Sequence, residues 1–198
     1  MSNYKIIIFD LGGIFLKNIF RELFKYLIKN NGADLDVLRK AFGPIFHKWK
    51  LSEINEREFW KRFRKDAKLE ISIEDLMTKI REKIKADQKM IEYAKSLKKK
   101  FRLIAASNNT KELGHDAIAR FKLNEIFEKI YLSCDIHLSK PDKRFFDYIL
   151  KDINAKAEDC IFVDDRIGIV NEAENLGFKS ILFESKEQLE RDIKNIIN

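Results

Sequence analysis

The sequence has little cysteine and proline, each of which occurs only twice among 198 residues, and it has no long apolar run. A membrane-spanning helix needs about 20 consecutive apolar residues, whereas the apolar run near the N-terminus ends at Asp10. That run is also unlike a secretory signal peptide. We therefore expect a cytoplasmic protein that does not enter a membrane.

The two cysteines, Cys134 and Cys160, lie in or beside apolar stretches and do not form a Cys-x-x-Cys pair. Such pairs are typical of redox and zinc sites. We expect two reduced thiols in the core, as is usual in the cytoplasm. The length suits one domain, or one domain with an insertion.

The formal net charge of +7 is spread along the chain and is not concentrated in one segment. Lysine-rich stretches such as 80–90 also contain acidic residues. A dispersed positive field attracts anionic small molecules and nucleic acids alike. Because only the isoelectric point and the lysine content favour nucleic acid, we do not expect it as the main partner.

Five short β-rich runs are present, and most of them lack the alternation of polar and apolar residues that half-exposed strands show. They are residues 4–9, 102–107, 129–133, 160–164 and 179–183. Continuous apolar strands are typical of a parallel sheet that is covered on both faces. The last four runs are separated by helical patterns, which indicate βαβ units, at residues 110–121, 141–153 and 168–177.

The first two runs are separated by a long segment with helical periodicity and no convincing strand. Helices are expected there at about 19–30, 34–48, 55–66 and 72–85, with 87–100 returning to the sheet. We predict an α/β fold with a Rossmann-like, parallel five-stranded sheet and an inserted all-helical segment. The predicted core comprises residues 1–17 and 87–198, and the predicted insertion comprises residues 18–86.

Polar residues follow four of the predicted strands, at the edge where open α/β sheets bind ligands. They are Asp10, then Ser107 to Asn109, then Lys140, and finally Asp164 and Asp165. A single Asp at a strand end is often a helix cap, and "SNNT" is a good start for a helix. Four such groups at successive strand ends are harder to explain by capping.

The residue types fit a site for a cation and a phosphate. Asp10 and Asp165 offer the oxygen ligands that Mg²⁺ prefers, and the backbone carbonyl of Gly12 adds a third oxygen. With the phosphate charge neutralised, a carboxylate can attack phosphorus and form an aspartyl-phosphate. Asp10 is the expected nucleophile.

The phosphate itself would bind to the neighbouring strand ends. Ser107 and the amide nitrogen of Asn108 precede a predicted helix, and helix N-termini bind phosphate oxygens. Lys140 supplies a point charge to the same phosphate and offsets the charge of Asp10. We therefore expect these three residues to bind the substrate, with Lys140 also taking part in catalysis.

The motifs that carry these residues resemble those of the haloacid dehalogenase-like (HAD) hydrolase superfamily along nearly the whole chain. "FDLGG", "IAASNN", "LSKPD" and "IFVDD" match its four motifs in order. The segments around the last two are similar to those of sugar-phosphate phosphatases and of the phosphatase domain of soluble epoxide hydrolases. The resemblance implies a Mg²⁺-dependent phosphatase with a helical cap, formed here by residues 18–86.

The resemblance also implies a role for each carboxylate. Asp10 would be the nucleophile, and the metal ligands would be Asp10, the Gly12 carbonyl and Asp165. Asp164 would support the site without binding the ion. The expected substrate is a small anionic phosphorylated metabolite, with sugar phosphates as one class.

Two positions depart from the family pattern. The family usually has an Asp two residues after the nucleophile, which acts as general acid and base, and this chain has Gly12 there. The fourth motif often has Asp or Asn four residues after its ligand, where this chain has Ile169. Both changes favour the alternative of a catalytically weak or inactive binding or regulatory protein with the HAD fold.

A metal-free dehalogenase of the same superfamily is a further alternative. Asp164 and Asp165 argue against it, because uncompensated carboxylates beside a nucleophile would repel an anionic substrate.

Arg166 is expected to be a surface cation, with a second substrate anchor as the alternative. The oligomeric state stays open.

The remaining aromatic and histidine residues carry less information. The aromatic residues of the predicted insertion recur at helical spacing, so we expect them to pack together, with one or two facing the substrate: Phe42, Phe46, Trp49, Phe59, Trp60 and Phe63. His47, His115 and His137 lack the spacing of metal ligands, and we expect surface or capping positions for them.

Overall fold

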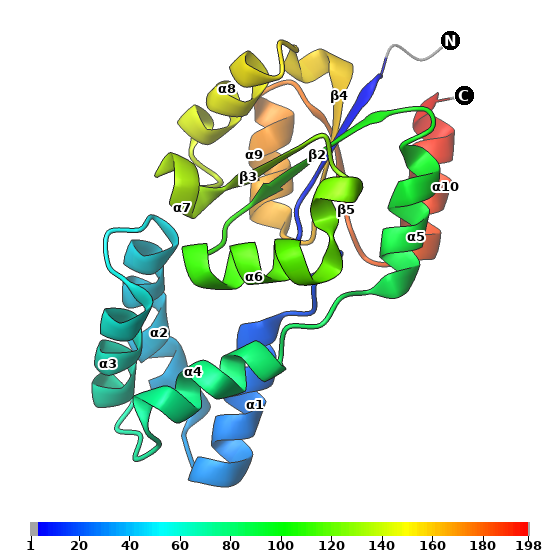
Figure 1. The fold of residues 1–198 in the computed structure, drawn as a ribbon. Helices are drawn as coiled ribbons and strands as arrows, with labels where there is room; N and C mark the ends of the chain where they lie inside the picture. The colour runs from blue at the N-terminus through cyan, green and yellow to red at the C-terminus, as the bar shows by residue number, and fades with distance from the viewer. Residues whose placement is uncertain (1–3, 198) are drawn as a thin grey trace.

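A parallel sheet with helices on both faces forms one part of the molecule, and a bundle of helices lies to one side of it (Figure 1). The computed structural model describes residues 4–197. The strand order is β3-β2-β1-β4-β5 and all neighbours are parallel. The strands are β1 (Ile6–Phe9), β2 (Arg102–Ser107), β3 (Lys129–Leu132), β4 (Cys160–Asp164) and β5 (Lys179–Leu182). The predicted α/β fold class is confirmed.

The central strand β1 is buried on both faces. Ile7 and Phe9 belong to one hydrophobic cluster, whereas Ile6 and Ile8 belong to another on the opposite face. This double burial explains why the strand has no alternation of polar and apolar residues. Phe9 is in register with residues of both β2 and β4, so the strands end at the same edge of the sheet.

Helices cover the two faces of the sheet unequally. The first cluster includes side chains of α5, α6 and α10, and the second includes side chains of α8 and α9. The helices of this part are α5 (Gln88–Leu97), α6 (Lys111–Phe121), α7 (Ser133–Ile136), α8 (Lys143–Asp152), α9 (Ile167–Asn175) and α10 (Lys186–Ile197).

The sequence analysis did not predict α7 or α10. Leu189 and Ile193 of α10, four residues apart, are both buried, and this helical spacing is the signal that was available.

Helices α1 to α4, which lie between β1 and α5 in the chain, form the helical insertion. A side-chain oxygen caps the start of each helix by accepting a bond from a backbone N–H group, as helix N-termini require; these residues are Asn18, Asp34, Asn55 and Ser72. The helices are α1 (Ile19–Asn31), α2 (Leu35–Lys50), α3 (Glu56–Asp66) and α4 (Ile73–Glu82).

The division of the chain into a core and a separate cap domain at residues 18–86 stays a prediction. Residues 1–3 and 198 of the predicted core lie outside the described residues. Within 4–197, no helix has the length and apolarity of a membrane span.

Aromatic rings form the centre of the helical insertion, as predicted. The rings of Trp49 and Phe59 stack with centroids 4.2 Å apart. Phe20 of α1 lies 5.0 Å from Phe46 of α2, centroid to centroid. Offset and edge-to-face contacts of this kind stabilise a core beyond the area that they bury.

Two connections between the sheet and the helical insertion run side by side. Leu16 forms an antiparallel bridge with Ala86, and Lys17 N–H donates to the carbonyl of Lys85 at 3.0 Å. Farther away, the Nε1–H of Trp49 donates to Glu112 Oε2 of α6 at 3.0 Å. The insertion is therefore attached through its paired connections and also through a contact between α2 and α6.

Glu56 provides a stability test within the helical insertion. Its side chain is buried, and its carboxylate accepts bonds from Arg81 Nη2 at 2.6 Å and from Trp60 Nε1 at 3.2 Å. Replacing Glu56 by Ala should lower the free energy of unfolding by about 2–3 kcal/mol, because Arg81 loses its carboxylate in a partly buried position. Urea denaturation measures this change.

The matched control is the exposed ion pair of Glu74 with Arg57, whose side chains are 66% and 68% exposed. Glu74→Ala should cost less than about 1 kcal/mol, because water screens exposed pairs. Equal losses in the two variants would contradict the structural role of Glu56.

Candidate active site

The polar residues predicted at the strand ends come together around one cavity of about 360 Å³. This size lies in the range of small-molecule sites. Asp10 follows β1, Ser107 ends β2, and Asp164 ends β4. All the predicted site residues line the cavity: Asp10, Gly12, Ser107, Asn108, Lys140, Asp164 and Asp165.

A buried lysine lies at the centre of the site. Lys140 is only 2% exposed, and its Nζ donates to Asp10 Oδ1 at 2.9 Å and to Asp164 Oδ2 at 2.5 Å. Burial alone would lower the pKa of Lys140, but the carboxylates of Asp10 and Asp164 raise it above its ordinary value. Lys140 therefore stays positively charged and holds two strand ends together.

The two consecutive carboxylates after β4 have different surroundings. Asp164 is fully buried, with one oxygen bonded to Lys140 and the other accepting from the N–H of Arg166 at 3.0 Å. Burial raises the pKa of Asp164, an effect that Lys140 opposes. Burial and the nearby charge of Asp10 also raise the pKa of Asp165. Because both oxygens of Asp164 are engaged within the chain, Asp165 is the better placed of the two to bind a ligand.

The donor set fits a hard cation. One oxygen from each of Asp10, Asp164 and Asp165 lies within 4.8 Å of the others. Together with Lys140, the three carboxylates leave an excess of negative charge in a largely buried place, which a divalent cation would offset. All three are oxygen donors, which Mg²⁺ prefers over nitrogen or sulfur. Asp10 and Asp165 could therefore hold Mg²⁺, with the charge of Asp164 beside them.

Gly13 is required by the site, although the sequence analysis did not single it out. Its φ angle is +76°, and a Cβ atom placed there would lie 2.0 Å from Asp165 Oδ2. A Cβ on the neighbouring Gly12 would lie 3.4 Å from Asp10 Oδ2, which is an ordinary contact. The second glycine of "FDLGG" thus leaves room for the Asp165 carboxylate, and the double glycine was the available signal.

The side chain of Asn108 holds the backbone of Lys140. Its Nδ2 donates to the carbonyl of Lys140 at 2.8 Å, and its Oδ1 accepts from the N–H of Lys140 at 2.9 Å. The side-chain amide therefore positions Lys140, and substrate binding by Asn108 would use its backbone N–H. Asn109 is engaged locally as well, since its N–H donates to Ser133 Oγ at 3.0 Å.

Two other residues from the fourth motif line the cavity. Ile169 is 4% exposed, so an apolar side chain is buried where family members often have Asp or Asn. Arg166 is exposed, as expected for a surface cation, and it also lies on the cavity wall. This position is compatible with a surface cation and with a second anchor for the substrate.

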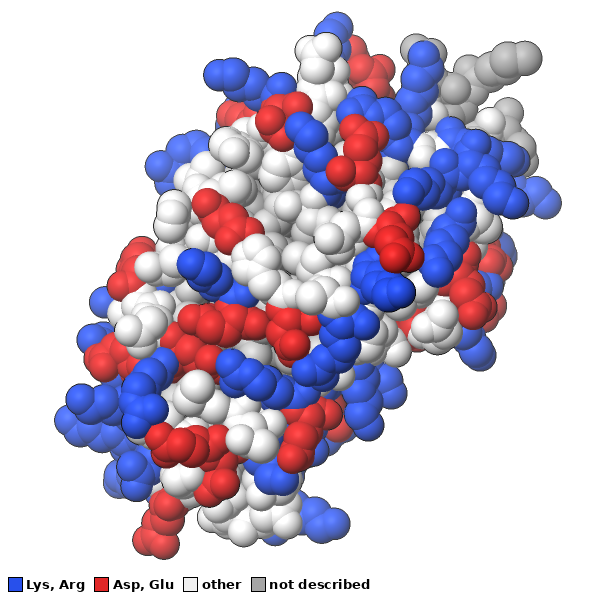
Figure 2. All heavy atoms as spheres, in the orientation of Figure 1, with Lys and Arg blue, Asp and Glu red and all other residues white. Residues whose placement is uncertain are grey.

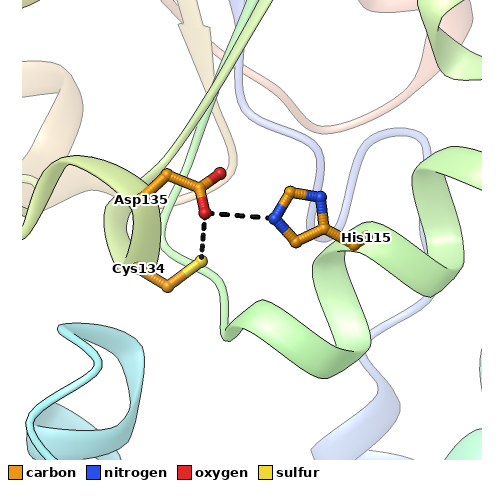
Figure 3. A group of neighbouring side chains, drawn as sticks. All are labelled: His115, Cys134 and Asp135. Atoms are coloured by element: carbon orange, nitrogen blue, oxygen red, sulfur yellow. Dashed lines mark hydrogen bonds and ion pairs between the residues drawn. The ribbon is translucent and has the colours of Figure 1, made fainter.

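A second group of possible metal ligands lies outside this cavity (Figure 3). His115 of α6 lies 3.0 Å from Asp135 Oδ1, and Cys134 Sγ lies 3.6 Å from the same oxygen. The spacing of the histidines in the sequence did not reveal this group. Burial, assisted by the charge of Asp135, raises the pKa of Cys134 to about 12, so the thiol is protonated in the absence of a metal. The group is accounted for as a surface His–Asp pair beside a core thiol.

The other predictions about side chains can also be compared with the structure. Both cysteines are buried and free, which confirms the predicted core thiols. On the face shown in Figure 2, basic and acidic side chains are interleaved. That face therefore gives no support to a nucleic-acid partner, which would favour a continuous basic surface.

Comparisons with known proteins agree with the motifs. A family model described as haloacid dehalogenase-like hydrolase matches residues 7–183. The chain is 29% identical to drimenol cyclase of Aspergillus calidoustus over 83% of this chain, but it spans only 33% of that protein. It is 24% identical to D-ribitol-5-phosphate phosphatase of Bacteroides thetaiotaomicron, over 98% of both chains.

A solved structure has a similar fold. It is a HAD family enzyme of Bacteroides thetaiotaomicron in complex with magnesium and inorganic phosphate, with a TM-score of 0.76 at 20% identity. The match covers 94% of this chain and 98% of that one. At this identity the likeness shows the fold alone.

The close approach of Gly13 to Asp165 can be tested by adding a single methyl group. Gly13→Ala should lower the free energy of unfolding by about 2 kcal/mol or more, because the new Cβ collides with the carboxylate and the left-handed backbone disfavours alanine. Gly12→Ala is the control, since its Cβ has room, and it should change stability by less than about 1 kcal/mol. Chemical denaturation of both variants gives the comparison, and similar stabilities would contradict the proposed crowding.

Proposed function

This chain belongs to the haloacid dehalogenase-like hydrolase family, and we propose that it is a Mg²⁺-dependent phosphatase of small phosphorylated metabolites. The observation that carries the proposal is the buried ion-pair network of Lys140 with Asp10 and Asp164 on the wall of the cavity. The network places the carboxylate of Asp10 and the positive charge of Lys140 side by side on the wall of the cavity. A phosphate ester placed there would meet a nucleophile and a compensating cation together.

In the proposed reaction, one carboxylate oxygen of Asp10 attacks phosphorus. The P–O bond to the alcohol breaks, and the electron pair leaves with the alcohol oxygen, which takes up a proton. Water then cleaves the aspartyl-phosphate, which releases phosphate and regenerates Asp10. Lys140 holds Asp10 Oδ1 at 2.9 Å, so it fixes the orientation of the nucleophile and offsets its charge.

The remaining site residues bind the phosphate and the cation. Asp10, the Gly12 carbonyl and Asp165 would hold Mg²⁺, whereas Asp164 anchors Lys140. When bound, the ion acts as a Lewis acid and neutralises charge on the phosphate. Ser107 and the backbone N–H of Asn108 would donate to phosphate oxygens near the start of α6.

The helical insertion would act as the cap that selects the substrate. Side chains of α1 and α2, such as Phe20 and Phe46, line the same cavity as Asp10. The paired connections at Leu16 and Ala86 join the insertion to the sheet beside this cavity. The alternative function is ligand binding without efficient turnover, which Gly12 and the buried Ile169 favour.

The experiment that tests the proposal is phosphate release from a panel of phosphorylated metabolites, with Mg²⁺ and with EDTA. Asp10→Asn should reduce the rate by about 10³-fold or more, because an amide of the same size cannot form the acyl-phosphate. Asp36→Asn is the control, since the Asp36 side chain is 79% exposed, and it should keep the wild-type rate. Thermal unfolding checks that both variants fold.

Two outcomes would contradict the proposal in different ways. Metal-dependent turnover that persists in Asp10→Asn would remove this residue from the mechanism. If the wild type releases no phosphate from any ester of the panel, the phosphatase function is contradicted and the alternative, ligand binding without efficient turnover, is favoured.

The missing acid at Gly12 gives a second prediction. General acid catalysis typically contributes about 10²–10⁴-fold, chiefly for poor leaving groups. The wild-type rate should therefore fall steeply as the pKa of the leaving alcohol rises, so that aryl, acyl and anomeric phosphates react well and primary-alcohol esters react poorly. Gly12→Asp should flatten this dependence, since the position has room for a Cβ. A flat wild-type series of aryl and alkyl phosphates would mean that another group supplies the proton.

A further inference from the structure

Much of the wall of the active-site cavity is apolar. Ile19 and Phe20 of α1, Phe46 of α2, and Leu113 and Ala117 of α6 all line it. Leu113 and Ala117 are one helical turn apart and therefore lie on the same face of α6. The rings of Phe20 and Phe46 lie 5.0 Å apart, centroid to centroid, so they form one continuous patch. We call these five residues the apolar wall.

The asparagines around the same cavity are engaged within the chain. Asn18 Oδ1 accepts from the N–H of Arg21 at 3.0 Å, and Asn109 Oδ1 accepts from the N–H of Thr110 at 2.9 Å. Both ends of the Asn108 amide are bonded to the backbone of Lys140. The side-chain oxygens of these three asparagines are therefore occupied, and the basic side chains on the cavity wall, Lys17 and Arg166, are donors only. A buried hydroxyl whose proton finds no acceptor weakens binding.

We propose that the natural substrate is a phosphate monoester of an apolar alcohol, whose hydrocarbon part packs against Phe20 and Phe46. This inference rests on the proposed phosphatase function and narrows its substrate class. The phosphate occupies the charged end near Lys140, and the hydrocarbon occupies the apolar wall. Because Gly12 supplies no acid, aryl esters are the members of this class that react fastest.

A matched pair of esters tests the inference on the wild-type protein with Mg²⁺. The pair is 4-propylphenyl phosphate and 4-(2,3-dihydroxypropyl)phenyl phosphate, which have similar leaving groups and differ in two hydroxyls. We expect kcat/KM to be about 10-fold to 100-fold higher for the propyl ester, which is the range in which apolar pockets discriminate. Equal values, or a preference for the diol, would overturn the inference and leave the phosphatase function standing.

Variants of the apolar wall assign the preference to named residues. Phe46→Gln should reduce the preference for the propyl ester by about 10-fold, chiefly through KM, because the contact is made before and during the reaction. Phe24→Gln is the control, since Phe24 packs in the same aromatic cluster, 5.4 Å from Phe42 by ring centroids, and does not line the cavity. An equal loss of preference in both variants would overturn the role of the wall. If Phe46→Gln does not fold, the ester pair on the wild type decides.

Binding of the corresponding phosphonates tests the preference for an apolar ligand independently of ester hydrolysis, because the C–P bond of a phosphonate is not cleaved by the proposed reaction. Titration calorimetry with 4-propylphenylphosphonate and its dihydroxypropyl analogue should show about 10-fold tighter binding of the propyl compound. This preference without ester turnover would support the apolar ligand and refute the phosphatase. Equal binding would overturn the inference, whether or not esters are hydrolysed.

Discussion

The ion-pair network of Lys140 is the interaction on which the rest of the site depends. A lysine that is 2% exposed keeps its charge only if carboxylates compensate it nearby, and Asp10 and Asp164 do so at 2.9 and 2.5 Å. These contacts join the ends of β1 and β4 to the loop before α8. Asn108, after β2, holds the backbone of the same lysine. One buried charge thus organises residues from four distant parts of the chain.

The fold was predictable because its signals are local. Each strand is a short apolar run, and double burial removed the alternation that would have indicated a half-exposed sheet. A parallel sheet brings the carboxyl ends of its strands to one edge, so residues such as Asp10, Ser107 and Asp164 were expected to lie together before any contact was known. Helix α10 was missed, although Leu189 and Ile193 have helical spacing.

The partners of individual side chains were not predictable, since they depend on packing between distant segments. The sequence places Asn108 at the edge of the sheet, but not its amide against the backbone of Lys140. The same holds for His115 and Asp135, which meet because α6 lies beside α7. Helical periodicity indicates that aromatic residues face inward, yet only the arrangement of α1 and α2 decides that Phe20 and Phe46 border the cavity.

The charged and apolar parts of the cavity influence each other. Apolar side chains exclude water, and in their presence the attraction between Lys140 and a phosphate is stronger than it would be in solution. The proposed second step, however, needs a water molecule beside Asp10. On the proposed mechanism, the hydrocarbon of the substrate occupies the space along Phe20 and Phe46 during attack and vacates it when the alcohol leaves. Water can then approach the aspartyl-phosphate through the space that the alcohol has left, so the apolar wall that excludes water during attack does not prevent hydrolysis in the second step.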